Sequence, residues 1–174
     1  MHCHGRVIVN ALVGHVLDVS TENCPIGRTL DVVGTSWTLR VLREAFFGVR
    51  RFGEFHERLG VSSALLTTRL GLLVDHGILT RDIDERPGER ARHEYRLTAK
   101  GRDLYPVLTA LRQWGEQYEL DEDGTPVNVH HRDCGATVGV QLVCAAGHPL
   151  PARDAVAEPG PGARQRTTTP RTPR

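Results

Sequence analysis

Residues 60–77 read GVSSALLTTRLGLLVDHG, and this stretch decides the fold. Leu66, Leu70 and Leu73 recur at the spacing that places side chains on one face of an α-helix. The other face carries serines, threonines and one arginine, whereas the solvent-facing side of a helix usually carries long, charged side chains. Hydroxyl and guanidinium groups suit contacts with phosphates and base edges. These two faces are typical of the second helix of a helix-turn-helix, which enters the DNA major groove.

The residues before this stretch predict three shorter helices. Residues 23–25 read Asn-Cys-Pro and indicate the start of the first helix, because proline is favoured at the first helical position; Gly34 ends it. We expect Ser36 to cap the second helix and Gly48 to end it. The third helix is short and stops at Gly60. Together with 60–77, four helices precede any strand.

The residues after this stretch predict a hairpin and a last helix. Two β-prone runs within 78–98 flank a charged turn at Pro87 and Gly88, which indicates a hairpin with a long tip. A helix then covers about 98–118, and Pro106 should bend it or lie in its first turns. The expected fold is therefore mainly α with a small β-hairpin, a winged helix-turn-helix whose wing is the hairpin.

Composition limits the classes of function. The 174 residues carry a formal charge of only +1, so a nucleic-acid partner must be argued from local residues. No run approaches the roughly 20 apolar residues of a membrane span, and we expect a cytoplasmic protein without a membrane partner. Four cysteines there do not predict a disulfide scaffold. We do not expect an enzyme, because no glycine-rich phosphate loop, Ser/His/Asp set or open metal site is evident.

Composition also divides the chain into four expected parts. Residues 1–20 lack helix caps or a clean period and should form a flexible extension, and 21–120 form the winged domain. Residues 121–157 are a small β segment, and 158–174, rich in Pro, Gly, Thr and Arg, should be a disordered basic tail. The tail arginines would add salt-dependent DNA affinity, although a tail that only aids solubility fits the composition equally well.

Six motifs between residues 22 and 118 form a recognisable set. They are Cys24-Pro25, Trp37-Thr38-Leu39, the run Arg51–Phe55, the run Leu66–Leu70, the run Tyr95–Thr98, and Trp114-Gly115. With these motifs the sequence resembles the HxlR-type winged helix-turn-helix transcription regulators of bacteria, distant relatives of the MarR type. The resemblance implies a homodimer that binds double-stranded DNA at operators near its own or neighbouring genes, and we expect it to act as a repressor.

The resemblance places most of the DNA contacts in the fourth helix and the wing. The expected contacts are Ser36, Arg51, Ser62, Ser63, Thr67, Thr68, Arg69, Arg86, Arg90 and Arg92. Residues 81–96 hold as many acids as arginines, so a solvated turn with internal ion pairs is the alternative for the wing. Two features depart from the family pattern. Gly71 inside the helix costs about 1 kcal/mol relative to alanine, and Leu72 and Val74 place apolar groups where the family is commonly charged.

The same resemblance builds the dimer from the first and last helices. The expected interface residues are Ile26, Leu30, Leu104, Leu108, Leu111 and Trp114. A last helix that follows a hairpin has little of its own domain left to pack on, although packing into the core is the alternative. Two subunits would present their recognition helices to half-sites about one DNA turn apart, so the operator should be an inverted repeat.

Cys24 is a candidate redox residue. It lies at the start of a predicted helix with Arg28 one turn later, and both the helix terminus and the cation favour a thiolate. Some HxlR-type regulators use the matching cysteine as a sensor. The alternative is that a small residue simply begins the helix. No second cysteine is near in the winged domain, so a disulfide between the Cys24 residues of two subunits would supply the partner.

Four residues near the C-terminus have the types and spacing of metal ligands. His131, Cys134, Cys144 and His148 form two pairs around a β-prone stretch, and His130 could replace His131. Two such pairs fit a structural zinc ion in a zinc-ribbon-like segment, since four ligands close a tetrahedral site. The alternative is a small hairpin with incidental ligands. No cofactor is otherwise required.

The sequence thus favours a sequence-specific DNA-binding regulator, with any small-molecule effector unknown. Winged helices also serve as docking domains, and the apolar Leu72 and Val74 would suit a protein partner. A protein-interaction module without specific DNA binding is therefore the alternative function.

Overall fold

The computed structural model describes residues 16–84 and 92–166, which form two units. One unit is Val32–Gln141, and the other takes in the described residues on either side of it. Helix α1 (Pro25–Val33) begins in one unit and ends in the other. This division differs from the expected parts, because residues 121–141 group with the winged domain and the start of α1 does not.

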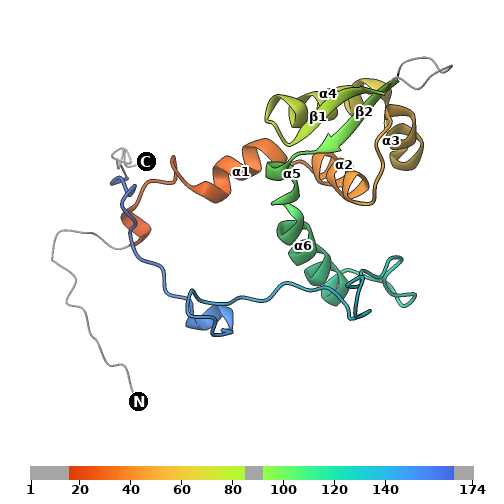
Figure 1. The fold of residues 1–174 in the computed structure, drawn as a ribbon. Coiled ribbons are helices and arrows are strands. Elements are labelled where there is room, and N and C mark those ends of the chain that lie inside the picture. Colours follow the sequence, from red (N-terminus) through yellow and green to blue (C-terminus); the bar gives the residue numbers. More distant parts are fainter. Residues whose placement is uncertain (1–15, 85–91, 167–174) are drawn as a thin grey trace, which may run out of the picture. The chain divides into compact units, whose positions relative to one another are not determined.

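Three helices carry the core of the unit Val32–Gln141 (Figure 1). They are α2 (Ser36–Phe46), α3 (Phe52–Leu59) and α4 (Ser63–Asp75). Each contributes fully buried side chains, among them Leu42, Phe55, Leu66, Leu70 and Leu73. The leucine stripe predicted for the fourth helix is therefore confirmed as its core face.

The start of α2 differs from the prediction by one residue. Thr35, not Ser36, is the N-cap: its Oγ1 accepts a hydrogen bond from the Thr38 amide at 3.3 Å. The Thr35 and Thr38 hydroxyls also lie 2.7 Å apart. The prediction that Ser36 caps this helix is wrong, because the buried Thr38 hydroxyl gives Thr35 a second partner that the sequence pattern does not reveal.

The turn between α3 and α4 confirms the predicted stop at Gly60 and holds a serine cap. Gly60 is the C-cap of α3 with φ 62°, in the left-handed region that glycine adopts without strain, and its amide donates to the His56 carbonyl. Ser62 caps α4 by accepting from the Leu65 amide at 3.3 Å. A helix, a glycine turn and a second helix are thus in place.

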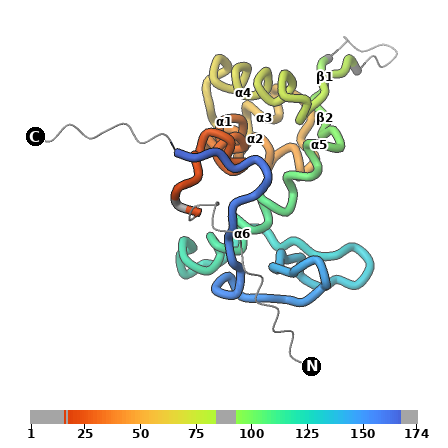
Figure 2. The backbone as a smooth tube through the Cα atoms, turned by 90° about the vertical axis from the view of Figure 1, so that its left-hand side faces the viewer, coloured from red at the N-terminus to blue at the C-terminus, as the bar shows by residue number. Residues whose placement is uncertain are grey.

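The wing is an antiparallel hairpin of β1 (Leu79–Asp84) and β2 (Arg92–Leu97), as predicted. Leu79 pairs with Leu97 at its base and Asp84 with Arg92 at its far end. The predicted tip, with Pro87 and Gly88, lies outside the described residues. In both views the hairpin runs beside α4 (Figures 1 and 2).

The last helical segment is split in two. Thr98 caps the short α5 (Ala99–Arg102), and α6 (Tyr105–Tyr118) follows after a break. Pro106 lies in the first turn of α6, where its missing N–H costs nothing, as predicted. No described helix combines the length and apolar character needed to cross a bilayer.

Residues 121–157 were expected to form a small β segment. In the structure they form isolated β-bridges and turns but no β-strand. His130 and Thr137 form one bridge, and the backbone near it docks on α6. Arg112 donates to the Val138 carbonyl at 2.5 Å, and the Gln113 amide group bonds both to the N–H and to the carbonyl of Val140.

The second unit joins two segments that the sequence predicts to be flexible or disordered. Val19 and Gln165 form an antiparallel bridge, flanked by hydrogen bonds from Ser20 N to Arg164 O and from Arg166 N to Asp18 O. The unit also holds the one-turn 3-10 helices η1 (Val16–Asp18) and η2 (Ala152–Asp154). Residues 1–15 and 167–174 lie outside the described part.

Candidate nucleic-acid interface

The exposed side of α4 is built from small, uncharged residues. Ser63, Ala64, Thr67, Thr68 and Gly71 are all exposed and follow one another at helical spacing. Because the opposite side of α4 is fully buried, the core holds this surface in one orientation. A duplex could approach such a helix closely, since no long side chain rises from the centre of its exposed face.

The hydroxyl groups of this helix already have local partners. Ser62 accepts a backbone amide as the N-cap, so its hydroxyl proton remains available to another acceptor. Thr67 donates to the Ser63 carbonyl at 2.8 Å, and Thr68 donates to the Ala64 carbonyl at 2.9 Å. With their protons committed, the two threonine oxygens can only accept a further hydrogen bond.

Arg69 lies at the edge of the exposed face of α4. The residue is half-buried, and its Nε is buried without a hydrogen-bond partner among the residues that the structure describes. A buried donor without a partner is costly. The side chain of Leu72, also half-buried, is one turn further along the same edge, and Val74 packs against the core. The apolar residues that depart from the family pattern are thus largely covered.

Ser36 and Arg51, the other expected contacts outside the wing, differ in their surroundings. Ser36 is exposed in the first turn of α2. The Arg51 guanidinium instead lies 3.6 Å from the buried carboxylate of Glu94 in β2, and the two residues also form a backbone bridge. The backbone amide of Tyr95 extends this link by donating to the Arg50 carbonyl at 2.8 Å. Arg51 therefore joins the wing to the start of α3.

Few of the expected DNA contacts of the wing lie among the described residues. Arg86 and Arg90 lie outside the described residues, and only the backbone of Arg92 is described. On β1, Arg81 is exposed, while Thr80 donates to the Asp82 carboxylate at 2.8 Å. The described strands thus carry two exposed arginines, Arg81 and Arg96, and a locally paired acid.

Glu44 is a residue that the sequence analysis missed. It is fully buried in α2, and its carboxylate is hydrogen bonded to Arg43 and to Arg58 of α3. Burial raises its pKa, but the two guanidinium groups outweigh burial and hold the pKa below its ordinary value. An acid in phase with the buried Val41 and next to α3 is the signal that could have identified it. The contact with Arg58 links α2 to α3.

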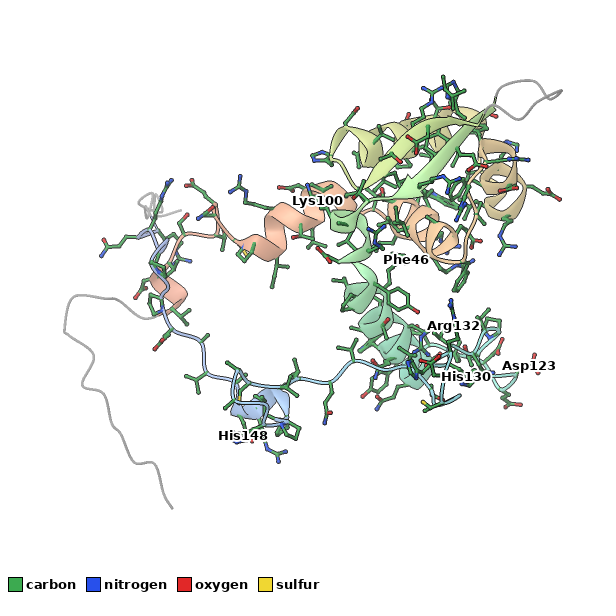
Figure 3. All side chains as sticks on the ribbon, viewed as in Figure 1. Phe46, Lys100, Asp123, His130, Arg132 and His148 are labelled. Atoms are coloured by element: carbon green, nitrogen blue, oxygen red, sulfur yellow. The ribbon has the colours of Figure 1, made fainter. Side chains whose placement is uncertain are left out.

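One side of α6 is apolar and uncovered. Val107, Leu111, Trp114 and Tyr118 are 45%, 49%, 57% and 61% exposed and recur at helical spacing, opposite the buried Thr109. Leu104 and Leu108 pack against the core instead, so the expected interface set divides between two faces. A groove of about 570 Å³ separates α6 from α2 beside this surface. Phe46 of α2 lies toward α6 there, with its ring 4.9 Å from that of Tyr105 (Figure 3).

The other interface candidates and the candidate redox residue lie on α1. Ile26 and Leu30 are 70% and 55% exposed. Cys24 is a half-buried free thiol directly before the helix. Arg28, expected to favour its thiolate, instead donates from Nη1 to the Asn23 side chain at 3.1 Å.

The expected metal ligands occur as two local pairs. His131 Nδ1 lies 3.2 Å from Cys134 Sγ within one turn. In the other unit, the Cys144 amide donates to the His148 carbonyl across a second turn. Within residues 16–84 and 92–166, no group of three or more His, Cys, Asp or Glu side chains lies close enough to hold a metal ion.

Comparison with known proteins connects this geometry to transcription. Residues 32–123 match the HxlR-like helix-turn-helix family. Over 142 residues the chain is 44% identical to the HTH-type transcriptional regulator Rv3095 of Mycobacterium tuberculosis, which covers 81% of this chain and 89% of that protein. It is 33% identical over 99 residues to the HTH-type transcriptional regulator YdeP of Bacillus subtilis, covering 56% of this chain and 76% of YdeP.

Two solved structures extend the comparison. PA1607, assigned as a transcription factor, superposes with a TM-score of 0.72 at 41% identity, over 79% of this chain and 95% of its own. The redox regulator HypR in its oxidised form superposes with a TM-score of 0.51 at 31% identity, over 56% of this chain and 100% of HypR.

Proposed function

The chain belongs to the HxlR-like helix-turn-helix family and is a transcriptional regulator of that type, and we propose that it binds operator DNA through α4. One observation carries the proposal: α4 buries Leu66, Leu70 and Leu73 completely and exposes only small, uncharged residues at its centre. A helix held in this way by a helix-turn-helix core enters the major groove.

Phosphate contacts would come from the edges of this surface. The Ser62 proton is free to reach a phosphate oxygen, and Ser63 and Ser36 are exposed at the starts of α4 and α2. Arg69 would find in a phosphate or base the partner that its side chain lacks within the described part of the chain. Arg51 is assigned to holding the wing rather than to DNA, because its guanidinium lies beside Glu94.

Fluorescence anisotropy on duplexes that tile the DNA upstream of the gene, with excess nonspecific competitor, tests the proposal. We expect one tile to bind tightly and the Ser63→Ala/Arg69→Ala double variant to lose that binding. The matched control is Arg132→Ala, an exposed arginine outside α4 (Figure 3). If no genomic DNA beats the competitor while the fold is intact, the interaction-module function replaces this one.

We propose that the regulator acts as a homodimer on an inverted repeat. The uncovered apolar residues of α6 and the exposed Ile26 and Leu30 of α1 support an interface with a second copy. Two α4 helices related by a twofold axis would then read two half-sites about one DNA turn apart. Repression is the proposed outcome, and a reporter gene behind the operator tests its direction: expression should rise when the regulator is deleted.

We propose further that Cys24 makes the DNA binding redox-responsive through a disulfide between two subunits. The half-buried free thiol of Cys24 and the similarity to HypR support this. Mild diamide treatment should change the operator affinity of the wild type but not of Cys24→Ser. An equal response of both proteins would assign the sensing elsewhere.

We also propose a structural zinc ion, held by His131, Cys134, Cys144 and His148. The 3.2 Å contact between His131 and Cys134 supports a ligand pair. Elemental analysis of the purified protein should give one zinc per chain, and Cys134→Ser should remove it. Protein purified without chelators and free of zinc would exclude the site.

A further inference from the structure

The centre of the α4 surface has an unusual chemical character for a DNA-reading helix. Ala64, Thr67, Thr68 and Gly71, here called the α4 centre, contain no charged group and no amide side chain. They offer methyl groups, two hydroxyl oxygens and bare backbone. The bidentate contacts that arginine makes to guanine, and that asparagine or glutamine makes to adenine, are therefore absent from these four residues.

The threonine hydroxyls are restricted to accepting. The protons of Thr67 and Thr68 are donated to the Ser63 and Ala64 carbonyls at 2.8 and 2.9 Å. Each oxygen keeps lone pairs that can face a donor, and both residues are exposed and carry a methyl group. The α4 centre thus combines acceptors with apolar contact area.

This combination distinguishes base pairs in the major groove. An A·T pair presents the amino donor of adenine and the C5-methyl group of thymine. A G·C pair presents the acceptors N7 and O6 of guanine and the amino donor of cytosine, but no methyl group. The threonine oxygens can accept from the amino group of either pair, so the apolar contact area, which is complementary to the thymine methyl group, is what favours A·T pairs.

Gly71 provides the close approach that such contacts need. It lies one turn beyond Thr67 and Thr68, and a Cβ at this position would meet no protein atom within 4 Å. Packing within the chain therefore does not explain a glycine that costs the helix about 1 kcal/mol. A need for open space on the DNA-reading side explains the glycine, because a methyl group of DNA can contact the backbone only where no side chain intervenes.

Building on the operator binding proposed above, we propose that the α4 centre reads A·T base pairs, through thymine methyl groups against Thr67, Thr68 and Gly71 and adenine amino groups against the threonine oxygens. The core of each half-site should therefore hold A·T pairs, and specificity there should depend on methyl groups more than on charge.

Replacing single thymines of the operator by deoxyuridine removes only the methyl group and tests the idea directly. We expect one or two positions in each half-site at which the substitution weakens binding about fourfold, as for one buried methyl group. Positions outside the half-sites should not respond. Uniform insensitivity of an operator that is still bound tightly would overturn this inference alone. Failure to find any bound operator would overturn the proposed function with it.

Protein variants identify the contacting residue. Thr67→Ser and Thr68→Ser keep the hydroxyl and remove the methyl group, so the responsible variant should bind the thymine operator more weakly and lose its response to deoxyuridine. The matching valine variants keep the methyl group and should keep that response. An unchanged deoxyuridine effect in both serine variants would contradict the assignment.

Gly71→Ala separates a reading role from a structural one. The added methyl group should raise the melting temperature, since alanine favours the helix, and should weaken operator binding by blocking the approach. A variant that gains stability and keeps full operator affinity would contradict the role of Gly71.

Discussion

Gly101 has no side chain, and this allows α5 to pack against the base of the wing. A Cβ built on Gly101 would lie 2.2 Å from the Ile78 carbonyl oxygen and 3.1 Å from Leu97 Cδ2. The obstacle is backbone and cannot rotate away, so α5 can meet the hairpin only with glycine here. We predict that Gly101→Ala destabilises the protein by about 1–3 kcal/mol, as for overpacking of a core, measured by urea unfolding.

The control for this substitution is Gly53→Ala. A Cβ on Gly53 in α3 would meet nothing within 4 Å, so the same added methyl group should be neutral or stabilise by up to about 1 kcal/mol. Equal effects of the two substitutions would show that helix propensity, rather than the contact with Ile78, controls both.

The residue scale also shows what the sequence could and could not predict. Leu66, Leu70 and Leu73 were predictable because helical periodicity is a local property, and all three are fully buried. The role of Arg51 in holding the wing was not predictable, because its partner Glu94 lies on a strand far along the chain. Sequence pattern identifies which face of a helix is buried, whereas side-chain pairing needs the fold.

At the scale of elements, the Glu44 carboxylate ties α2 to α3 of the helix-turn-helix. Its pKa lies below the ordinary value in the folded state, so the ionised form stabilises the fold. That contribution is fully present above the pKa of a free glutamate, about 4.3, and is lost as the pH falls through the lowered folded value. The Arg43 and Arg58 side chains are half exposed, so solvent weakens the charge part.

We predict that Glu44→Gln costs about 1–3 kcal/mol at pH 7, the range for a buried hydrogen-bonded charge. The difference from the wild type should shrink as the pH is lowered below about 4, because both proteins then carry a neutral side chain. Urea unfolding at several pH values measures this, and a difference that grows on acidification would contradict the direction of the pKa shift.

The elements themselves were largely predictable. Glycine stops such as Gly60, proline at a helix start and β-prone runs around a turn are local signals, and the helices and the hairpin occur where they indicate. The break before Tyr105 was foreseen only as a bend at Pro106. The docking of residues 138–140 on Arg112 and Gln113 had no signal, because it uses backbone groups that every sequence carries.

At the scale of the whole molecule, the fully buried side chains among residues 16–84 and 92–166 all lie in the unit Val32–Gln141. We therefore predict that a chain ending at Gln141 keeps the unfolding midpoint of this unit. Trp37 and Trp114, the two tryptophans of the chain, both belong to the unit, so their fluorescence reports its unfolding. A large drop in the midpoint would show that residues 142–174 contribute to its stability.

The uncovered side of α6 leads to the last prediction, which concerns assembly. Trp114 is 57% exposed in the apolar row that also holds Val107, Leu111 and Tyr118. A charge there should cost a single subunit little and a dimer much, since pairing would bury it without a partner. We predict that Trp114→Glu sediments as a monomer at concentrations where the wild type is a dimer, and that it binds an isolated half-site as the wild type does but gains nothing from the second half-site.

The control is Gln117→Glu, which places the same charge on an exposed position of α6 outside that row. It should leave both the dimer and the cooperative binding intact. If Trp114→Glu remained dimeric, the interface would lie on α1 alone, because Ile26 and Leu30 are the other exposed apolar pair expected to meet a second copy. The spacing of the half-sites would then be set by α1 rather than by α6.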